Sequence, residues 1–184
     1  MISTKCSVFI ATSLDGFIAR SDGSIDWLER ANASVPAGED CGYADFMQTV
    51  DAIVMGRATF EKVLSFPDWP YSSKPVYVLS TTIRGLPAGV PGSVHLLNTT
   101  PDDVVRRTAE AGHRHLYIDG GRTIQAFLRA GLITKLTISV IPILLGSGIK
   151  LFGERQAETN LRLLSSKAFP FGFVQSHYAV YQEA

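Results

Sequence analysis

The chain has 184 residues, of which 46% are hydrophobic, and its 17 Lys and Arg balance its 17 Asp and Glu to a formal net charge of zero. This balance excludes binding of nucleic acid or of an anionic membrane by bulk charge, and a charged fraction of only 18% excludes a disordered chain. The length and composition predict one globular domain over residues 1–184, and a surface without net charge favours self-association.

The pattern of apolar runs predicts strands alternating with helices. Apolar, β-branched runs bounded by turn residues predict strands at 5–12, 52–55, 75–80, 94–97, 115–118 and 134–141. Helices are predicted at 102–111, after a Thr-Thr-Pro start at 99–101, and at 122–129, between Gly-Gly and Gly131. Residues 161–168 and 172–181 read as a closing antiparallel pair joined around Pro170-Phe171.

This order predicts an α/β domain with a mostly parallel sheet and an antiparallel C-terminal edge. The stretch 15–42 is rich in Gly, Asp and Ser and shows no regular periodicity. It is predicted to be a long loop of the kind that belongs to a binding site.

No segment has the features of a signal peptide or of a membrane span. The apolar run at 8–11 stops at Thr12, and the run at 140–145 is short and contains Pro142. We therefore expect a cytoplasmic protein with no membrane partner and no nucleic-acid partner. Cys6 and Cys41 form no Cys-x-x-Cys pair and no cluster with histidines, so we expect reduced thiols and no metal site.

Three turns at the carboxyl ends of predicted strands carry groups that suit phosphates. They are Gly56-Arg57-Ala58-Thr59, Ser80-Thr81-Thr82 with Arg84 beyond it, and Gly120-Gly121-Arg122-Thr123. Each turn taken alone is also an ordinary tight turn. Because the carboxyl ends of parallel strands meet at one edge of a sheet, the three together favour a nucleotide with several phosphates. The Gly-x-Gly-x-x-Gly fingerprint is absent, which disfavours an ordinary Rossmann domain.

Five motifs carry a resemblance to a known family. They are Ser13-Leu-Asp-Gly-Phe-Ile-Ala19, Val50-Asp-Ala-Ile-Val-Met-Gly-Arg-Ala-Thr-Phe-Glu61, Val78-Leu-Ser-Thr-Thr82, Ile118-Asp-Gly-Gly121 and Pro142-Ile-Leu-Leu-Gly-Ser-Gly148. In this order and spacing, over nearly the whole chain, they resemble the dihydrofolate reductase superfamily. Within it the chain is most similar to the C-terminal reductase domain of the bacterial riboflavin-biosynthesis deaminase-reductase. The resemblance implies a dihydrofolate-reductase-like three-layer sandwich around an eight-stranded, mostly parallel mixed sheet, with NADPH as cofactor and a homodimeric assembly.

The resemblance also implies which residues contact NADPH. Those implied to flank the nicotinamide ring are Ala11 and Ile18. Those implied to contact the adenosine phosphate and the diphosphate are Gly56, Arg57, Ala58 and Thr59, with Arg57 as the partner of the 2′-phosphate. The adenine-ribose side is implied at Leu79, Ser80 and Thr81, and the diphosphate-binding helix start at Gly120, Gly121, Arg122, Thr123 and Ile124.

On the substrate side, two acids are candidates for the catalytic carboxyl. Asp119 occupies the place of a substrate-binding glutamate that precedes the Gly-Gly pair in riboflavin-pathway reductases. Asp45 lies, with Asp40 nearby, after the first long loop, where dihydrofolate reductases carry an acid. Asp45 is equally interpreted as a solvated first-turn helix acid. Trp27 and Phe46 are candidates for stacking a flat heterocycle, or they cover the core. The chain departs from the riboflavin branch at Phe9, where that branch has a lysine, and it lacks that branch's Asp-Asp-Pro segment.

The sequence therefore predicts an NADPH-dependent reductase of a small heterocycle, pterin-like or of the aminouracil kind found in riboflavin synthesis. The first alternative is a module that binds NADP(H) for regulation and does not turn over, which the missing lysine motivates. A further alternative is a flavin-binding domain of similar layer order.

Overall fold

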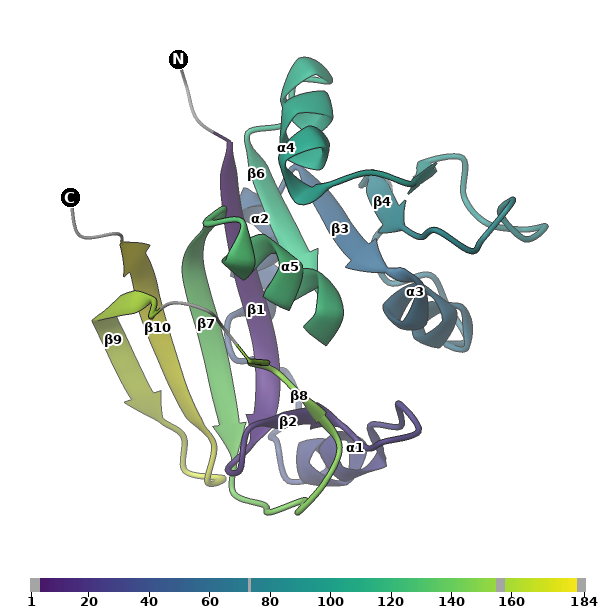
Figure 1. The fold of residues 1–184 in the computed structure, drawn as a ribbon. Coiled ribbons are helices and arrows are strands. Elements are labelled where there is room, and N and C mark those ends of the chain that lie inside the picture. Colours follow the sequence, from purple (N-terminus) through teal and green to yellow (C-terminus); the bar gives the residue numbers. More distant parts are fainter. Residues whose placement is uncertain (1–3, 73, 155–157, 182–184) are drawn as a thin grey trace.

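A computed structural model describes residues 4–72, 74–154 and 158–181. Eight strands form its central sheet (Figure 1): β1 (Lys5–Ser13), β3 (Ala52–Gly56), β4 (Val76–Leu79), β5 (Val94–Leu97), β6 (His115–Asp119), β7 (Ile133–Ile141), β9 (Asn160–Ala168) and β10 (Val174–Tyr181). Their order across the sheet is β5-β4-β3-β6-β1-β7-β10-β9. The six parallel strands are mainly runs of apolar or β-branched residues, as the sequence predicted, whereas β9 and β10 mix apolar with polar residues.

The first six strands in this order pair in parallel, and β10 and β9 pair antiparallel at one edge. The predicted mixed sheet, mostly parallel with an antiparallel C-terminal edge, is confirmed. Parallel pairing brings the carboxyl ends of β1, β3, β4, β5, β6 and β7 to one edge of the sheet (Figure 1). The three predicted phosphate turns follow β3, β4 and β6 and therefore lie together at these carboxyl ends.

Helices cover both faces of the sheet, because alternate residues of each strand point to opposite faces. On one face, α4 (Pro101–Glu110) and α5 (Gly121–Arg129) bury a core that includes Ala52 and Val54 of β3. On the other face, α2 (Tyr43–Thr49) and α3 (Arg57–Leu64) pack on a core that includes Ile53 and Met55. Figure 1 shows α4 and α5 in front of the sheet and α2 behind it. The predicted three layers are confirmed.

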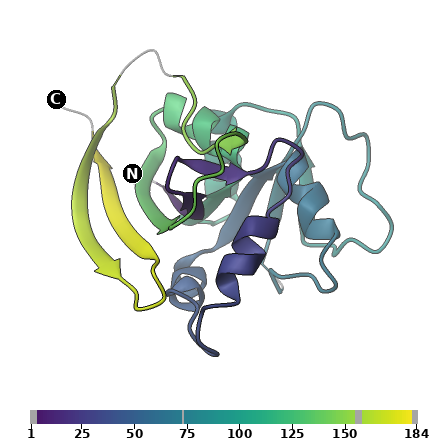
Figure 2. The ribbon, with the colours of Figure 1, turned by 90° about the horizontal axis from the view of Figure 1, so that it is seen from below.

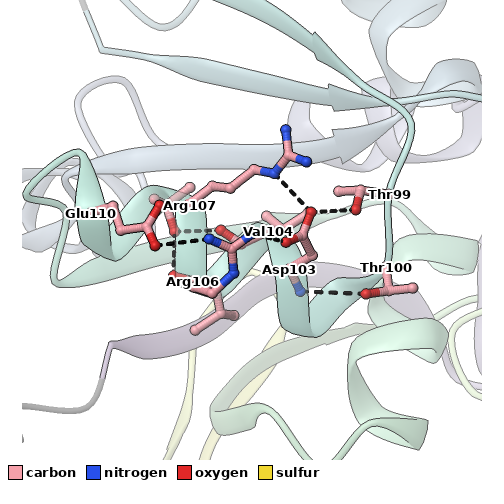
Figure 3. Close-up of polar contacts among 9 residues, drawn as sticks. Thr99, Thr100, Asp103, Val104, Arg106, Arg107 and Glu110 are labelled. Carbon is pink, nitrogen blue, oxygen red and sulfur yellow. Dashed lines mark hydrogen bonds and ion pairs between the residues drawn. The ribbon is translucent and has the colours of Figure 1, made fainter.

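The start of α4 follows its sequence signature closely (Figure 3). The hydroxyl of Thr100 accepts a hydrogen bond from the backbone N–H of Asp103, and Pro101 is the first helical residue. The carboxylate of Asp103 in turn accepts hydrogen bonds from Thr99 Oγ1 at 2.5 Å, from Arg107 Nε at 2.7 Å and from the guanidinium of Arg106. These bonds, that from Thr99 first, lower the pKa of Asp103 to about 2.

The prediction of an irregular loop over 15–42 is wrong in part. This stretch contains β2 (Phe17–Ala19) and α1 (Asp26–Asn32). The strand β2 pairs with β8 (Ile149–Lys150), more than 100 residues away, so no local pattern marks it. Ile25, the N-cap residue of α1, supplies no side-chain cap. The helix is anchored by Trp27, which is 1% exposed and packs with Ile141, Phe169 and Phe173.

Smaller differences concern the ends of elements and one connection. The last strand begins at Val174 rather than at residue 172, because Gly172 has a φ of +97° and donates its N–H to the Phe169 carbonyl in a turn. The parallel strands β4 and β5 are joined by an irregular segment rather than by a helix. No helix in the described ranges is long and apolar enough to cross a bilayer.

Candidate functional site

Two turns that the sequence singled out pack directly against each other. Gly56 ends β3 and precedes α3, and a Cβ placed on it would lie 2.8 Å from Oγ1 of Thr123 in α5. Gly120 ends the β6 turn with a φ of +88°, and a Cβ placed on it would overlap Oγ1 of Thr59 in α3. Each turn therefore needs a glycine where the other presents a threonine. The structure brings together Gly56, Thr59, Gly120 and Thr123, as the phosphate argument requires.

The loop after β1 closes over the second of these turns. A Cβ placed on Gly121 would lie 2.9 Å from Cδ1 of Ile18, so Ile18 lies against the start of α5. The loop is fixed by Asp15, whose carboxylate accepts hydrogen bonds from Ser13 Oγ at 2.6 Å and from the N–H of Gly146 at 2.7 Å. These bonds, that from Ser13 first, lower the pKa of Asp15 to about 2, so the anchor stays ionised at neutral pH.

The starts of α3 and α5 are the natural places for an anion. Their N-cap residues are Gly56 and Gly120, no side chain caps either helix, and neither first turn contains an acid. The first-turn N–H groups of both helices, with the positive ends of their dipoles, are therefore available to a ligand. The start of α4 differs, because it is capped by Thr100 and carries Asp102 and Asp103 in its first turn.

Cationic and polar side chains surround these two helix starts. Arg57 is half exposed and its guanidinium lies 3.0 Å from the Glu61 carboxylate, an exposed i,i+4 pair that a phosphate can displace. Arg122 and Ala58 are exposed. Ile124 is buried in the core, so only its backbone atoms can contact a ligand, and Leu79 packs partly buried against the same core.

The turn after β4 is less open than the other two. Ser80 Oγ accepts the N–H groups of Thr82 at 3.1 Å and of Ile83 at 3.0 Å, which fixes the turn and occupies that oxygen. Thr81 is exposed beside it. This turn therefore offers a hydroxyl and a defined backbone shape rather than free N–H groups.

A cavity of about 660 Å³ opens on the face of the sheet that carries α1, α2 and α3. Its volume falls in the range of small-molecule sites. Its described wall consists of Phe9, Ala11, Leu28, Asn32, Val35, Pro36, Glu39, Asp40, Cys41, Tyr43, Phe66, Pro70, Tyr71, Tyr117, Asp119, Ser139, Ile141 and Phe173. Since Asp119 lines the cavity and Gly120 follows it, the cavity and the uncapped helix starts adjoin each other.

Asp119 is the acid with the most perturbed environment in this wall. Burial raises the pKa of its carboxyl to about 6, against the opposing hydrogen bond from the Gly120 N–H at 2.8 Å. The hydroxyl of Tyr117 donates a hydrogen bond to the Phe9 carbonyl at 2.9 Å, and its interaction with the Asp119 carboxyl is a further, smaller influence that lowers the pKa of Asp119. Asp119 therefore exchanges its proton near neutral pH.

Two tyrosines of the cavity wall were missed by the sequence analysis. Burial, and then the charge of Asp119, raise the pKa of Tyr43 to about 12 and raise that of Tyr71 further. Both hydroxyls therefore stay protonated and can donate hydrogen bonds into the cavity. Tyr43 comes from α2 and Tyr71 from the segment after α3, and no sequence spacing links either of them to Asp119.

The other substrate-side candidates lie outside the described wall of the cavity. Asp45 is exposed in the first turn of α2. Trp27 is buried in the core beneath α1, and Phe46 stacks on Phe9 with ring centroids 5.1 Å apart. Phe46 thus packs behind a wall residue. Of the two candidates for the catalytic carboxyl, Asp119 lines the described wall and Asp45 does not; Asp40, the other acid near the first long loop, lines it as well.

Comparison with known proteins gives consistent matches. The model of the RibD C-terminal domain family matches residues 4–174. The uncharacterized protein YwjB of Bacillus subtilis (strain 168) is 41% identical over 183 residues, covering 95% of this chain and 97% of YwjB. The uncharacterized protein YyaP of the same organism is 27% identical over 182 residues, covering 92% of this chain and 91% of YyaP.

Solved structures agree with these matches. A putative riboflavin biosynthesis protein from Shewanella sp. PV-4 has 42% identity and a TM-score of 0.90, over 97% of this chain and 99% of that chain. The deaminase/5-amino-6-(5-phosphoribosylamino)uracil reductase of Thermotoga maritima has 14% identity and a TM-score of 0.71. That match covers 97% of this chain and 57% of the Thermotoga chain, and at this identity it shows a shared fold only.

Proposed function

Because the chain belongs to the RibD C-terminal domain family, we propose that it is an NADPH-dependent reductase that transfers a hydride to a small heterocycle, pterin-like or aminouracil-like. The observation that carries this proposal is the mutual packing of the Gly56–Thr59 and Gly120–Thr123 turns beside the cavity. Two uncapped helix starts at one edge suit a diphosphate, and an adjoining cavity suits the group that is reduced.

The residues present fit NADPH on physical grounds. The first-turn N–H groups of α3 and α5 would hold phosphates, and Arg57 would release Glu61 to bind the 2′-phosphate. Ile18, held against Gly121 by the anchored loop, and Ala11, on the cavity wall, would flank the nicotinamide. When bound, NADPH supplies the hydride, and the chain supplies orientation and a site closed to bulk water.

Asp119 is the proposed catalytic residue. Its carboxyl lies on the cavity wall and titrates near pH 6, so it can hold a proton for the substrate atom that becomes basic as the hydride arrives. Tyr43 and Tyr71 would donate hydrogen bonds that orient the heterocycle. Asp45 is given no step, because it is exposed and is not part of the described wall.

We also propose a homodimer that forms through the edge of the sheet at β9. Three leucines of this strand, Leu161, Leu163 and Leu164, are 39%, 54% and 47% exposed. Among the described residues, β9 pairs with β10 alone, so its outer edge is open. A partner chain can pair with this edge and cover the leucines, and an identical chain offers the same surface. Figure 2 shows the β9–β10 pair curving along the outside of the molecule.

Fluorescence titration of NADPH tests the cofactor assignment. We expect saturable binding, with NADPH preferred over NADH, and we expect Arg57→Ala to weaken NADPH binding by about tenfold or more while NADH binding changes little. Arg106→Ala is the matched control, because Arg106 is likewise an exposed arginine paired with a glutamate four residues on. No change in NADPH emission, or an equal effect of the two variants, would reject the assignment.

A further inference from the structure

The charges that line the cavity are of one sign. Three of its described wall residues, Glu39, Asp40 and Asp119, are acids, and none is a lysine, an arginine or a histidine. The backbone N–H groups of Ala44 and Gly42 lower the pKa of Asp40, so that carboxyl stays ionised. The rest of the wall is aromatic, aliphatic or neutral and polar.

The cations near this region lie outside the described wall of the cavity. Lys62, whose ammonium lies 5.7 Å from the ring centroid of the wall residue Phe66, also lies 3.9 Å from the Glu29 carboxylate. Lys167 acts on Cys41 electrostatically, but its ammonium lies 4.2 Å from the ring centroid of Phe169 and it is not part of the described wall. Arg57 and Arg122 belong to the starts of α3 and α5, where the cofactor phosphates are proposed to bind. A dianion inside the cavity would therefore face three carboxyl groups, of which Asp40 is partly compensated by the Gly42 and Ala44 N–H groups, and no cationic side chain of the described wall.

We propose that this cavity takes a neutral or cationic flat heterocycle that carries no phosphate, and that it rejects the same heterocycle as a phosphate ester. The proposal rests on the proposed function only in taking the ligand to be a heterocycle. Aromatic residues and tyrosine hydroxyls give the cavity affinity for a flat polar ring, and the acids give it selectivity against an anion. The reductase would then act before a phosphate is attached to its substrate or after one has been removed.

Calorimetric titration with matched pairs tests this inference. The probes are 5-amino-6-(ribosylamino)uracil and its 5′-phosphate, and 6-hydroxymethylpterin and its phosphate ester. Each titration is run with and without NADP⁺, so that binding of a phosphate at the helix starts is separated from binding in the cavity. For each pair that binds, we expect the affinity of the phosphate ester to be lower than that of its unphosphorylated partner by about tenfold or more, equivalent to about 1.4 kcal/mol.

Two variants at Glu39 make the electrostatic cause testable. Glu39→Lys should bring the affinities of the two members of a pair within about threefold of each other or reverse them. Glu39→Gln keeps the shape and the oxygen that accepts the Cys41 N–H at 2.7 Å, so it should reduce the discrimination only in part.

The inference is overturned if an ester binds as tightly as its unphosphorylated partner, if Glu39→Lys leaves the ratio unchanged, or if no member of any pair binds at millimolar concentration. Failure of the reductase proposal gives a different result, since NADPH would then fail to bind while the pairs still differ in affinity.

Discussion

At the scale of single residues, Asp119 links the proposed chemistry to the stability of the fold. Its raised pKa comes from burial on the cavity wall rather than from a neighbouring charge. A carboxyl that loses its proton near pH 6 is useful to a reductase that must supply a proton, and it is costly to a fold that must bury its charge at neutral pH.

The first prediction at this scale concerns activity. The rate of hydride transfer should fall as the pH rises through about 6, because the protonated fraction of Asp119 falls about tenfold per pH unit above its pKa. Asp119→Asn should lower the rate by about 100-fold or more and remove this dependence. Asp45→Asn is the control, and single-turnover rates across the pH range measure both. If Asp45→Asn removes the pH dependence of the rate and Asp119→Asn does not, Asp45 is the proton donor and the assignment to Asp119 is wrong.

The second prediction concerns stability. The native state holds the Asp119 proton up to about pH 6, whereas an unfolded aspartate releases it near its ordinary value of 3.8. The contribution of Asp119 to the stability of the fold is therefore fully present below pH 3.8 and is lost as the pH rises through about 6. Asp119→Asn should raise the free energy of unfolding at neutral pH by on the order of 1–3 kcal/mol and much less near pH 4. Denaturant melts at the two pH values measure this, and an equal effect at both would contradict it.

Some residues of the site could be recognised in the sequence, and others could be found only in the folded structure. Gly56, Thr59, Gly120 and Thr123 follow strands at one edge of a parallel sheet, so their convergence was predictable. Asp119 was found because it precedes the Gly-Gly pair. Tyr43 and Tyr71 come from a helix and a segment that have no fixed spacing to Asp119, so only the packed structure brings them together.

At the scale of elements, the junction of the β3–α3 and β6–α5 turns leaves no room for a side chain at either glycine. Gly120→Ala should strain a φ of +88° and press a Cβ onto Thr59, so it should destabilise the protein by more than about 1 kcal/mol and weaken NADPH binding. Gly112→Ala is the matched control, since its φ is +94° but nothing lies within 4 Å of the added Cβ. Thermal melts and NADPH titrations compare them, and loss of NADPH binding in both variants would contradict this account.

The elements themselves were predictable where a local pattern determines them. The strands of the central sheet and α4 were located to within two residues, because apolar runs, Thr100 with Pro101 and flanking glycines mark them. The resemblance to the riboflavin-type reductases is confirmed by the family match over residues 4–174. The elements missed are α1, β2 and β8, which are short and owe their form to long-range packing and pairing. For α2 and α3 the sequence analysis gave no bounds.

At the scale of the whole molecule, the free edge at β9 predicts the assembly. We expect a particle of twice the chain mass in light scattering after size-exclusion chromatography. Leu163→Arg should shift the mass toward that of one chain, because a charge at this edge opposes strand pairing and burial. Leu144→Arg is the control, since Leu144 is 69% exposed and lies outside the strands. A monomeric wild type, or a dimer that survives Leu163→Arg and dissociates with Leu144→Arg, would contradict the proposed interface.

The central claim is that the paired turns and the adjoining cavity form one site for hydride transfer. The most direct measurement is the reaction of NADPH carrying deuterium at both C4 positions with a panel of unphosphorylated pterins and aminouracils, followed by mass spectrometry. We expect an oxidised cofactor that keeps one deuterium, one deuterium in the reduced substrate and a rate slowed by the heavier isotope. Tight NADPH binding with no deuterium transferred to any member of the panel would contradict the central claim and would favour a regulatory module that binds the cofactor without turnover.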